Sequence, residues 1–311
     1  MADQPSPALH RFALATSGCT VLLLMAGALV TSNDAADSVP DWPLAYHKII
    51  PPMIGGIRYE FAHRVVAAIA AILTTVLAIW LARSAARTAV KTLGWTAFGL
   101  VLAQAGLGAL RVLFHHPAVI ATIHATVAQI FFLTTVALAY HTGADAAPAS
   151  APAEDTGTPL VRSICVGTTA VILIQLVLGA GFRHGAFGIL PHLLGAVAVT
   201  LMMIWTGRVA KSRFRSVPEI RRGVALLHAT FGTQILLGFG AYWAVAKAAT
   251  DPQPTPLYVI LTVAHVVVGA LVLASSVTLT LSSMRLTRPD SEAATAGASA
   301  RAAAPAEGSR I

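Results

Sequence analysis

Four histidines recur at similar positions in the sequence, and their residue type and spacing are the first indication of chemistry. Each lies near one end of a long apolar segment and is followed by small or branched residues. A polar side chain inside a membrane is costly, so it tends to face the interior of a helix bundle. Imidazoles on facing helices commonly ligate haem iron, and small neighbours leave room for a flat ligand. The four residues are His63, His124, His192 and His265.

Two of these histidines fall in each half of the chain, which predicts two haem-sized sites near the same membrane surface. Packing explains a single buried histidine well, but it explains four at one depth poorly. Zinc is a weaker alternative, because no carboxylate or thiolate cluster completes a tetrahedral site. The other histidines are expected to have no ligand role. They are His10, His47, His115, His116, His141, His184 and His228.

Glu60 precedes His63 by three residues, which places both side chains on one face of a helix. It is the only acid that we expect inside a spanning segment. One interpretation is a proton acceptor or charge stabiliser beside a haem edge. The alternative is an interfacial carboxylate paired to Arg58 or Arg64. Nothing equivalent precedes His192, so we expect one reactive site and one electron-transfer site.

Three arginines are predicted at the same ends of their helices as the four histidines. Guanidinium groups pair well with carboxylates, so haem propionates are plausible partners for them. The alternative is that they only anchor the membrane topology. They are Arg64, Arg111 and Arg183.

The composition indicates that lipid surrounds the elements that position these residues. Hydrophobic residues make up 56% of the 311 residues and charged residues 11%, whereas a soluble domain has about 25% charged residues. A water-soluble enzyme and general disorder are therefore excluded. Eight segments have the roughly 20 apolar residues of a spanning helix. They are about 12–31, 59–82, 92–113, 118–140, 160–182, 188–208, 222–246 and 256–284.

The predicted fold is an all-α integral membrane protein with eight transmembrane helices, arranged as two pseudo-symmetric four-helix bundles. The segment between the bundles is rich in Ala and Pro, which is typical of a flexible linker. The C-terminal segment, rich in Ala and Ser, is expected to be disordered. The predicted organisation is an N-terminal segment 1–11, a first half 12–142, a linker 143–159, a second half 160–284 and a tail 285–311.

A weak internal repeat supports the division into halves. Three of the four helices predicted to run outward carry a Gln followed four residues later by a Gly, and the first has only Gly27 at the matching place. Gln in lipid needs a partner, and Gly permits close helix approach. We favour ordinary helix packing as the explanation. The three pairs are Gln104 and Gly108, Gln175 and Gly179, and Gln234 and Gly238.

The basic residues predict the orientation. With the N-terminus inside, 15 of the 21 Lys and Arg residues lie on the inner side and six on the outer side. Both termini are therefore expected in the cytoplasm, in a multi-pass protein of a bacterial plasma membrane. The net charge of +8 lies in short clusters between apolar segments, which argues against nucleic acid as a partner. Cys19 and Cys165 lie inside apolar segments, so no disulfide is expected.

Several of these residues form motifs that resemble the haem A synthase family. Gly27-Ala-Leu-Val-Thr31 and Asp41-Trp42-Pro43-Leu44 are similar to the opening signature of that family, and Glu60-Phe-Ala-His63-Arg64 is similar to its Glu-x-x-His-Arg motif. The resemblance covers about residues 12–284. The other family histidines correspond to His124, His192 and His265.

The resemblance implies an oxidoreductase that converts haem O to haem A for terminal oxidases. The family oxidises a ring methyl group to a formyl group, usually described as two hydroxylations and loss of water. By this resemblance His63 and His124 frame the substrate haem O, and Glu60 acts on the oxidised intermediate or its protons. His192 and His265 ligate a resident haem b that passes electrons.

The resemblance also implies partners, and two rival functions remain open. Haem O synthase, oxidase assembly factors and membrane lipid are implied partners, and a homo-oligomer is left open. The outer loops contain no cysteine, so the chain resembles a cysteine-free branch. One rival is a bis-histidine membrane cytochrome b that leaves haem unmodified, which gives Glu60 no clear task. The other is a transporter, although the repeat runs parallel and lacks an interrupted helix pair.

Overall fold

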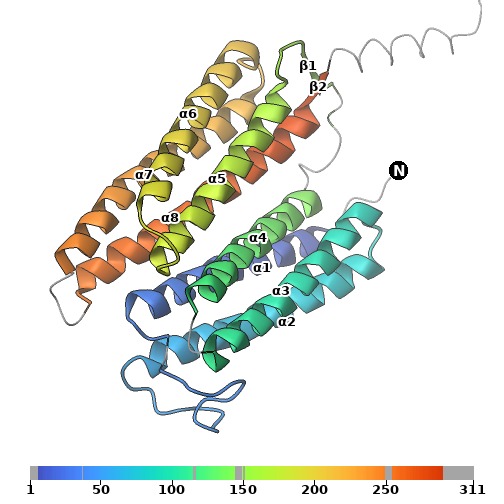
Figure 1. The fold of residues 1–311 in the computed structure, drawn as a ribbon. Helices are drawn as coiled ribbons and strands as arrows, with labels where there is room; N and C mark the ends of the chain where they lie inside the picture. The colour runs from blue at the N-terminus through green and yellow to red at the C-terminus, as the bar shows by residue number, and fades with distance from the viewer. Residues whose placement is uncertain are drawn as a thin grey trace, which may run out of the picture.

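The computed structural model describes residues 6–36, 38–114, 117–143, 149, 151–248 and 254–289. Within these residues, eight helices are long and apolar enough to cross a membrane. They form two groups of four (Figure 1), so the predicted fold class is confirmed. The helices are α1 (Pro7–Ser32), α2 (Ile57–Arg83), α3 (Thr88–Leu113), α4 (Ala118–Thr142), α5 (Val161–Arg183), α6 (Leu190–Arg213), α7 (Pro218–Ala248) and α8 (Pro256–Leu286).

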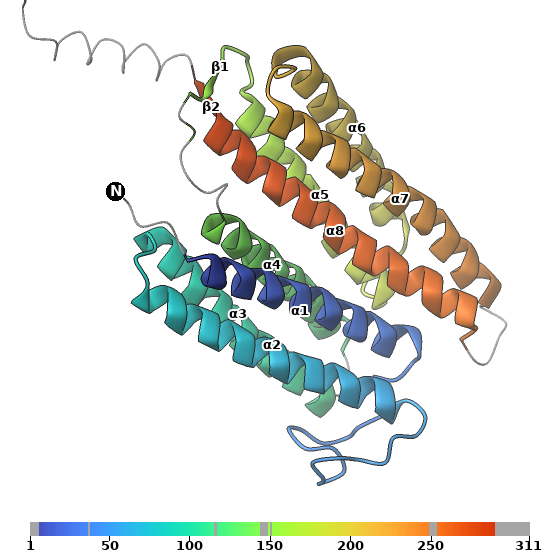
Figure 2. The same cartoon turned by 180° about the vertical axis from the view of Figure 1, so that it is seen from behind.

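Each group of four closes into a ring of neighbouring helices. In the first half α1 packs on α2 and α4, and α3 packs on the same two helices; α5 to α8 repeat this arrangement in the second half. The halves meet through α1 and α4 on one side and α5 and α8 on the other, as Figure 2 shows from behind. We call the end at which α1 joins α2 and α5 joins α6 the histidine end. The opposite end is the linker end.

Local sequence signals start these helices and satisfy their backbone. The hydroxyl of Ser6 accepts the N–H of Leu9 at the start of α1, and Thr255 accepts the N–H of Tyr258 at the start of α8. A proline follows each capping residue, where its missing N–H is harmless. Helices are also the natural choice in lipid, because every backbone polar group is paired within the segment.

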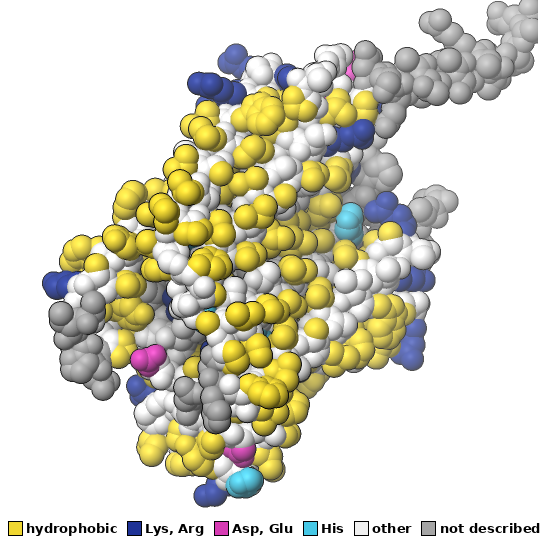
Figure 3. Space-filling view, viewed as in Figure 1, with side chains coloured by type: hydrophobic (Ala, Val, Ile, Leu, Met, Phe, Trp, Pro, Cys, Tyr) yellow, Lys and Arg dark blue, Asp and Glu magenta, His cyan; other side chains and the backbone are white. Residues whose placement is uncertain are grey.

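Apolar side chains form three buried clusters and also cover the outer surface of the helices. Each half has its own core, and a smaller cluster of Leu24, Phe132 and Ala270 joins α1, α4 and α8 between the halves. On the outside, apolar side chains cover the flanks of the helices, while Lys and Arg gather toward the ends (Figure 3). An exposed apolar flank needs lipid as its solvent, as the composition predicted.

Two short strands at the linker end were not predicted from the sequence. Strand β1 (Ala153–Asp155) lies in the segment expected to be a linker, and β2 (Thr287–Pro289) lies at the start of the expected tail. They pair in parallel. Asp155 is buried and its carboxylate accepts the N–H of Val161 at 2.6 Å, which caps the start of α5. Residues 290–311 of the expected tail lie outside the described residues.

Candidate active site

The structure places the four histidines on alternate helices at the histidine end. His63 is on α2, His124 on α4, His192 on α6 and His265 on α8, each within the first three turns of its helix. In each half the two histidine helices are separated by the other two helices of the ring. Their side chains therefore approach one another across the interior of the bundle.

In the second half the two imidazoles face each other directly. The ring centroids of His192 and His265 are 6.3 Å apart, and the ring planes are nearly perpendicular at 84°. A metal–imidazole bond is about 2 Å long. Two imidazole nitrogens, each at this distance from one metal ion, would give a centroid separation of about this size.

In the first half the corresponding residues lie near one another with additional charge. His124 interacts electrostatically with His63 and with Arg111, and His63 interacts with Arg111 and Arg64. The first pair is thus surrounded by guanidinium groups.

A glycine on the preceding helix supports each imidazole. Gly27, on α1, supports His63, and three later glycines repeat the arrangement. A Cβ atom at any of them would lie against the Cε1 atom of the histidine, so each glycine lets two helices approach closely around the ring. The distance from such a Cβ to Cε1 is 3.2 Å at Gly27 (His63), 3.7 Å at Gly108 (His124), 2.9 Å at Gly179 (His192) and 3.1 Å at Gly238 (His265).

The three repeated glutamines contact three of the four histidines. From the sequence we had favoured ordinary helix packing as the explanation for these glutamines. Each lies one turn from a supporting glycine and reaches across to the histidine helix. On α1 the matching residue is Leu23, so the first histidine lacks this support. Nε2 of Gln104 donates to the backbone carbonyl of His124 at 2.9 Å, and Nε2 of Gln175 donates to the backbone carbonyl of His192 at 2.9 Å. Nε2 of Gln234 lies 3.3 Å from the ring atom Nε2 of His265.

These glutamines also explain some of the small residues that follow the histidines. We expected those residues to leave room for a flat ligand. At Gly195 a side chain would collide with Oε1 of Gln175, and at Gly269 it would lie 3.0 Å from Nε2 of Gln234. At Gly195 and Gly269, the space left by the missing side chain is therefore occupied by a glutamine side chain.

The donor set of the site fits haem iron better than zinc. Buried Nδ1 atoms of all four histidines have no hydrogen-bond partner among the described residues. A buried polar atom without a partner is costly unless it serves another function, such as metal ligation. Within the described part of the chain, no group of three His, Cys, Asp or Glu residues could hold a metal ion. Two imidazoles per half match the two axial positions of a haem.

Glu60 is buried beside this site, with only 5% of its surface exposed. Its Oε1 accepts a hydrogen bond from Nη2 of Arg64 at 2.7 Å, and its Oε2 accepts the backbone N–H of Val39 at 3.0 Å. Of the two arginines proposed as partners, the structure therefore selects Arg64. Arg58 instead donates to the hydroxyl of Tyr59 on the surface.

Arg64 joins Glu60 to the loop that connects α1 and α2. Its Nη1 donates to the carbonyls of Asp41 and Leu44, both at 2.8 Å, and Nη2 approaches the carbonyl of Val39 at 3.4 Å. The loop lies beyond the ends of α2 and α3 in Figure 1. Arg64 was expected to bind a haem propionate, but its guanidinium already contacts Glu60 and three loop carbonyls.

Asp41 folds the same loop. Its carboxylate accepts the N–H of Tyr46 at 2.7 Å and of His47 at 2.8 Å, and both residues have positive φ, near 55°. Such left-handed residues are strained unless other contacts hold them. The N–H of His47, with that of Tyr46, lowers the pKa of the Asp41 carboxyl against the opposing effect of burial. The Asp41 motif is thus first of all a loop-folding motif.

Arg183 lies where the halves meet, whereas Arg111 lies in the last turn of α3. Arg183 crosses from α5 to α1, and its Nη2 donates to the carbonyl of Ala28 at 3.1 Å and to Oγ of Ser32 at 2.7 Å. Ser32 in turn pairs with Thr262 of α8 at 2.8 Å. Arg111 interacts with both histidines of the first half.

His184 is a site residue that the sequence analysis missed. It follows Arg183 directly and was assigned to a loop without a role. It interacts with Arg111 and Arg183 and also with His124 of the first half. Burial and, to a smaller degree, the two cationic arginines lower its pKa to about 4. No sequence signal other than the adjacent Gly185, which marks a helix end, pointed to this position.

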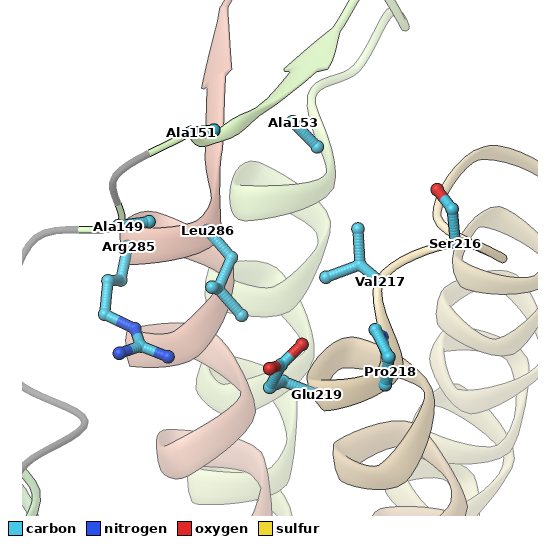
Figure 4. A pocket seen from close by; sticks show the side chains of 9 residues that line it. All are labelled: Ala149, Ala151, Ala153, Ser216, Val217, Pro218, Glu219, Arg285 and Leu286. Carbon is cyan, nitrogen blue, oxygen red and sulfur yellow. The ribbon is translucent and has the colours of Figure 1, made fainter.

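A cavity of about 380 Å³ lies elsewhere, at the linker end (Figure 4). Ala153 of β1, Glu219 at the start of α7 and Arg285 near the end of α8 are among the residues that line it. The helices separate this cavity from the four histidines. It is therefore not part of the candidate active site.

Comparison with known proteins shows which proteins the chain resembles. A family model described as cytochrome oxidase assembly protein matches residues 3–136, which include Glu60, both histidines of the first half and the loop that they face. Over these residues the chain is similar to this family. The match to the model thus coincides with the first four-helix half.

Individual relatives in this family are haem A synthases. That of Symbiobacterium thermophilum is 29% identical over 263 residues, which cover 74% of this chain and 84% of the relative. That of Lysinibacillus sphaericus is 33% identical over 133 residues, 42% of this chain and 43% of the relative. That of Halalkalibacterium halodurans is 32% identical over 138 residues, 42% of this chain and 46% of the relative. The chain thus matches less than half the length of the last two.

Proposed function

We propose that the protein is a haem A synthase, which oxidises a ring methyl group of haem O to the formyl group of haem A. One observation carries the proposal: each half has an imidazole pair at the histidine end, and the haem A synthase of Symbiobacterium thermophilum aligns with 84% of its length. That alignment is too long to fit within either half alone. Two haem-sized sites in one chain suit an enzyme that needs both a haem substrate and a resident haem.

The first half would hold the substrate. His63 and His124 would lie on either side of the haem O macrocycle, with Glu60 three residues from His63. Conversion of the ring methyl group to a formyl group removes hydrogen from the ring substituent, so a buried carboxylate beside it would have a task as a proton acceptor. The loop held by Glu60 and Arg64 would cover the haem edge and exclude bulk water.

The second half would hold a resident haem b between His192 and His265. When bound there, haem b supplies one-electron exchange. The chain contributes the two imidazoles, the glycines that let the helices close around them, and the glutamines that fix the backbone of α6 and the ring of His265. Neighbours of this kind orient the ligands of a metal and tune it.

The orientation and partners follow from the same proposal. The excess of basic residues on the side of the linker end supports cytoplasmic termini in a bacterial plasma membrane. Haem O synthase would supply the substrate, and oxidase assembly factors would receive the product. The chain would work as a cysteine-free member of the family, since its outer loops contain none.

Pigment analysis tests the function. The protein is purified from cells that make haem O but have no other haem A synthase, and the extracted pigments are separated. We expect haem A with the wild-type chain and only haem O and haem b with Glu60→Ala. Normal haem b without any haem A in the wild type would instead favour a membrane cytochrome b that only carries electrons.

A further inference from the structure

A compact turn at the end of α5 fixes the position of His184. The N–H of His184 bonds to the carbonyl of Ala180, and the N–H of Ala186 reaches back to Gly181 at 2.8 Å. Gly185 follows with φ of +74°, which closes the helix in the manner of a Schellman motif. The ring of Phe187 lies where a side chain at Gly181 would be. The turn therefore has little freedom to move.

This turn belongs to the second half but is built against the first. Arg183, the last residue of α5, donates to Ala28 and Ser32 of α1. Ser32 also bonds to Thr262 of α8, so the contact is part of a polar network across the interface. The residue that follows Arg183 is thereby held at the boundary between the halves.

His184 lies close enough to the first half to interact electrostatically with residues of the candidate substrate site. The charged groups that act on it are Arg111 of α3 and its neighbour Arg183, and it in turn acts on His124 of α4. His124 also interacts with His63 and Arg111. A second-half residue thus belongs to the surroundings of the first-half histidine pair.

The three side chains offer the donors that a carboxylate requires. Arg111 and Arg183 carry positive charge, and the imidazole of His184 can donate a further N–H. The carboxylate of Glu60 accepts hydrogen bonds from the guanidinium of Arg64 and from the backbone N–H of Val39, which belongs to the loop between α1 and α2. Charge-assisted hydrogen bonds from guanidinium to carboxylate are strong and directional. A haem is a flat apolar ring with two carboxylates on one edge, so its acidic edge matches this cluster.

We propose that His184 is a positioning residue through which the second half completes the substrate site, binding a haem carboxylate together with Arg111 and Arg183. The identity of the substrate rests on the function proposed above. The placement of His184 does not. In this arrangement neither half alone forms a complete site for haem O.

A binding cycle with an esterified substrate tests the proposal. Haem O and its dimethyl ester, in which both carboxylates are blocked, are titrated by absorbance into detergent-purified full-length protein. Loss of one such hydrogen bond corresponds to about a tenfold change in affinity. We expect the wild type to bind the free acid more tightly than the ester, and His184→Ala to lose about tenfold of this preference while Arg111 and Arg183 keep the remainder. His184→Asn keeps an N–H donor and should retain part of the preference.

His47→Ala provides a matched control, because His47 is an exposed histidine of the outer loop whose side chain is 92% exposed. It should keep the wild-type preference. The spectrum of haem b in the second half reports whether each variant is folded. An undiminished preference for the free acid in His184→Ala overturns the proposal, and so does a wild type that fails to bind haem O. If the proposed function alone is wrong, no haem A forms. The preference for the free acid over the ester still persists in the wild type and is about tenfold smaller in His184→Ala.

Discussion

The two halves share a scaffold but differ at the histidine end. In both, glycines on α1, α3, α5 and α7 support imidazoles on the helices that follow them. Among the described residues at this end, only the first half adds a buried acid, Glu60, and a long loop tied to it through Arg64. Only the second half has glutamine contacts to both of its histidines, and its α5–α6 connection is a short turn.

The difference shows how a duplicated bundle can separate two tasks. Supports for both ligands favour a haem that stays bound, as a resident cofactor must. The first half has Leu23 where the glutamine would be, and a long loop lies at its histidine end. In the proposed function this half takes a molecule that enters and leaves. Breaking either set of contacts should therefore affect one half and spare the other.

The largest effect is expected at the resident site. His192→Ala or His265→Ala should abolish nearly all haem b binding, because one axial ligand is lost from a pair only 6.3 Å apart. The absorbance of reduced minus oxidised protein measures this loss. His228→Ala, at a histidine that contacts the carbonyls of Val224 and Met203, is the control and should retain haem b. Full haem b in both single variants would contradict the ligand assignment.

The next effect is expected at the reactive site. Glu60→Gln keeps the size of the side chain but removes its charge, and loss of a general base typically slows a reaction by about 10² to 10⁴ fold. Conversion of haem O should fall by this factor while haem b remains at its wild-type level. Arg64→Lys separates the role of Glu60 as a base from its role in holding the loop. The lysine keeps a positive charge beside Glu60 but loses hydrogen bonds of Arg64 to the loop carbonyls. If Glu60→Gln converts haem O at the wild-type rate, Glu60 is only a tether for the loop.

A smaller effect is expected from the glycine supports. An alanine at Gly179 would place its Cβ 2.9 Å from Cε1 of His192, whereas at Gly108 the distance to His124 is an ordinary 3.7 Å. Overpacking of this kind costs roughly 1–3 kcal/mol. Gly179→Ala should lower the melting temperature of the haem b-loaded protein, and Gly108→Ala should leave it nearly unchanged. Equal shifts in the two variants would show that the supports are not specific to their histidines.

The smallest effect concerns acid and the outer loop. Asp41 has a pKa below its usual 3.8, so its contribution to loop stability is present above that value and is lost as the pH falls through the lowered pKa. Amide exchange of Tyr46 and His47, corrected for the intrinsic pH dependence, should therefore show less protection at a pH below the lowered pKa than at a pH above 3.8. In Asp41→Asn the protection should be reduced at both pH values. Protection that does not change with pH in the wild type would assign the fold of the loop to other contacts.

The sequence was enough to predict the eight spans and their grouping, because long apolar runs in lipid leave the backbone few alternatives to helix. The strands β1 and β2 were not predictable, since three residues carry too little pattern. The pairing of Glu60 with Arg64 was one of two foreseen alternatives. The contact of Glu60 with Val39 depends on how the loop between α1 and α2 folds. Two residues of that loop have positive φ, which the local sequence does not reveal.

The candidate site was only partly accessible from sequence. The position of a histidine within an apolar segment can be read directly from the sequence, so all four histidines could be named as candidates. The role of Gln104 and its equivalents depends on which helices are neighbours, and that is a property of tertiary packing. His184 could not be found for the same reason, because its partners Arg111 and His124 lie in the other half of the chain.

The pairing of β1 with β2 has a consequence for the chain as a whole. It joins the residues that lead into α5 to those that follow α8, so the second half begins and ends at one point. A polypeptide closed in this way is suited to be made as a separate piece. If the gene were split between codons 143 and 151, the two products should reassemble in the bilayer through α1, α4, α5 and α8.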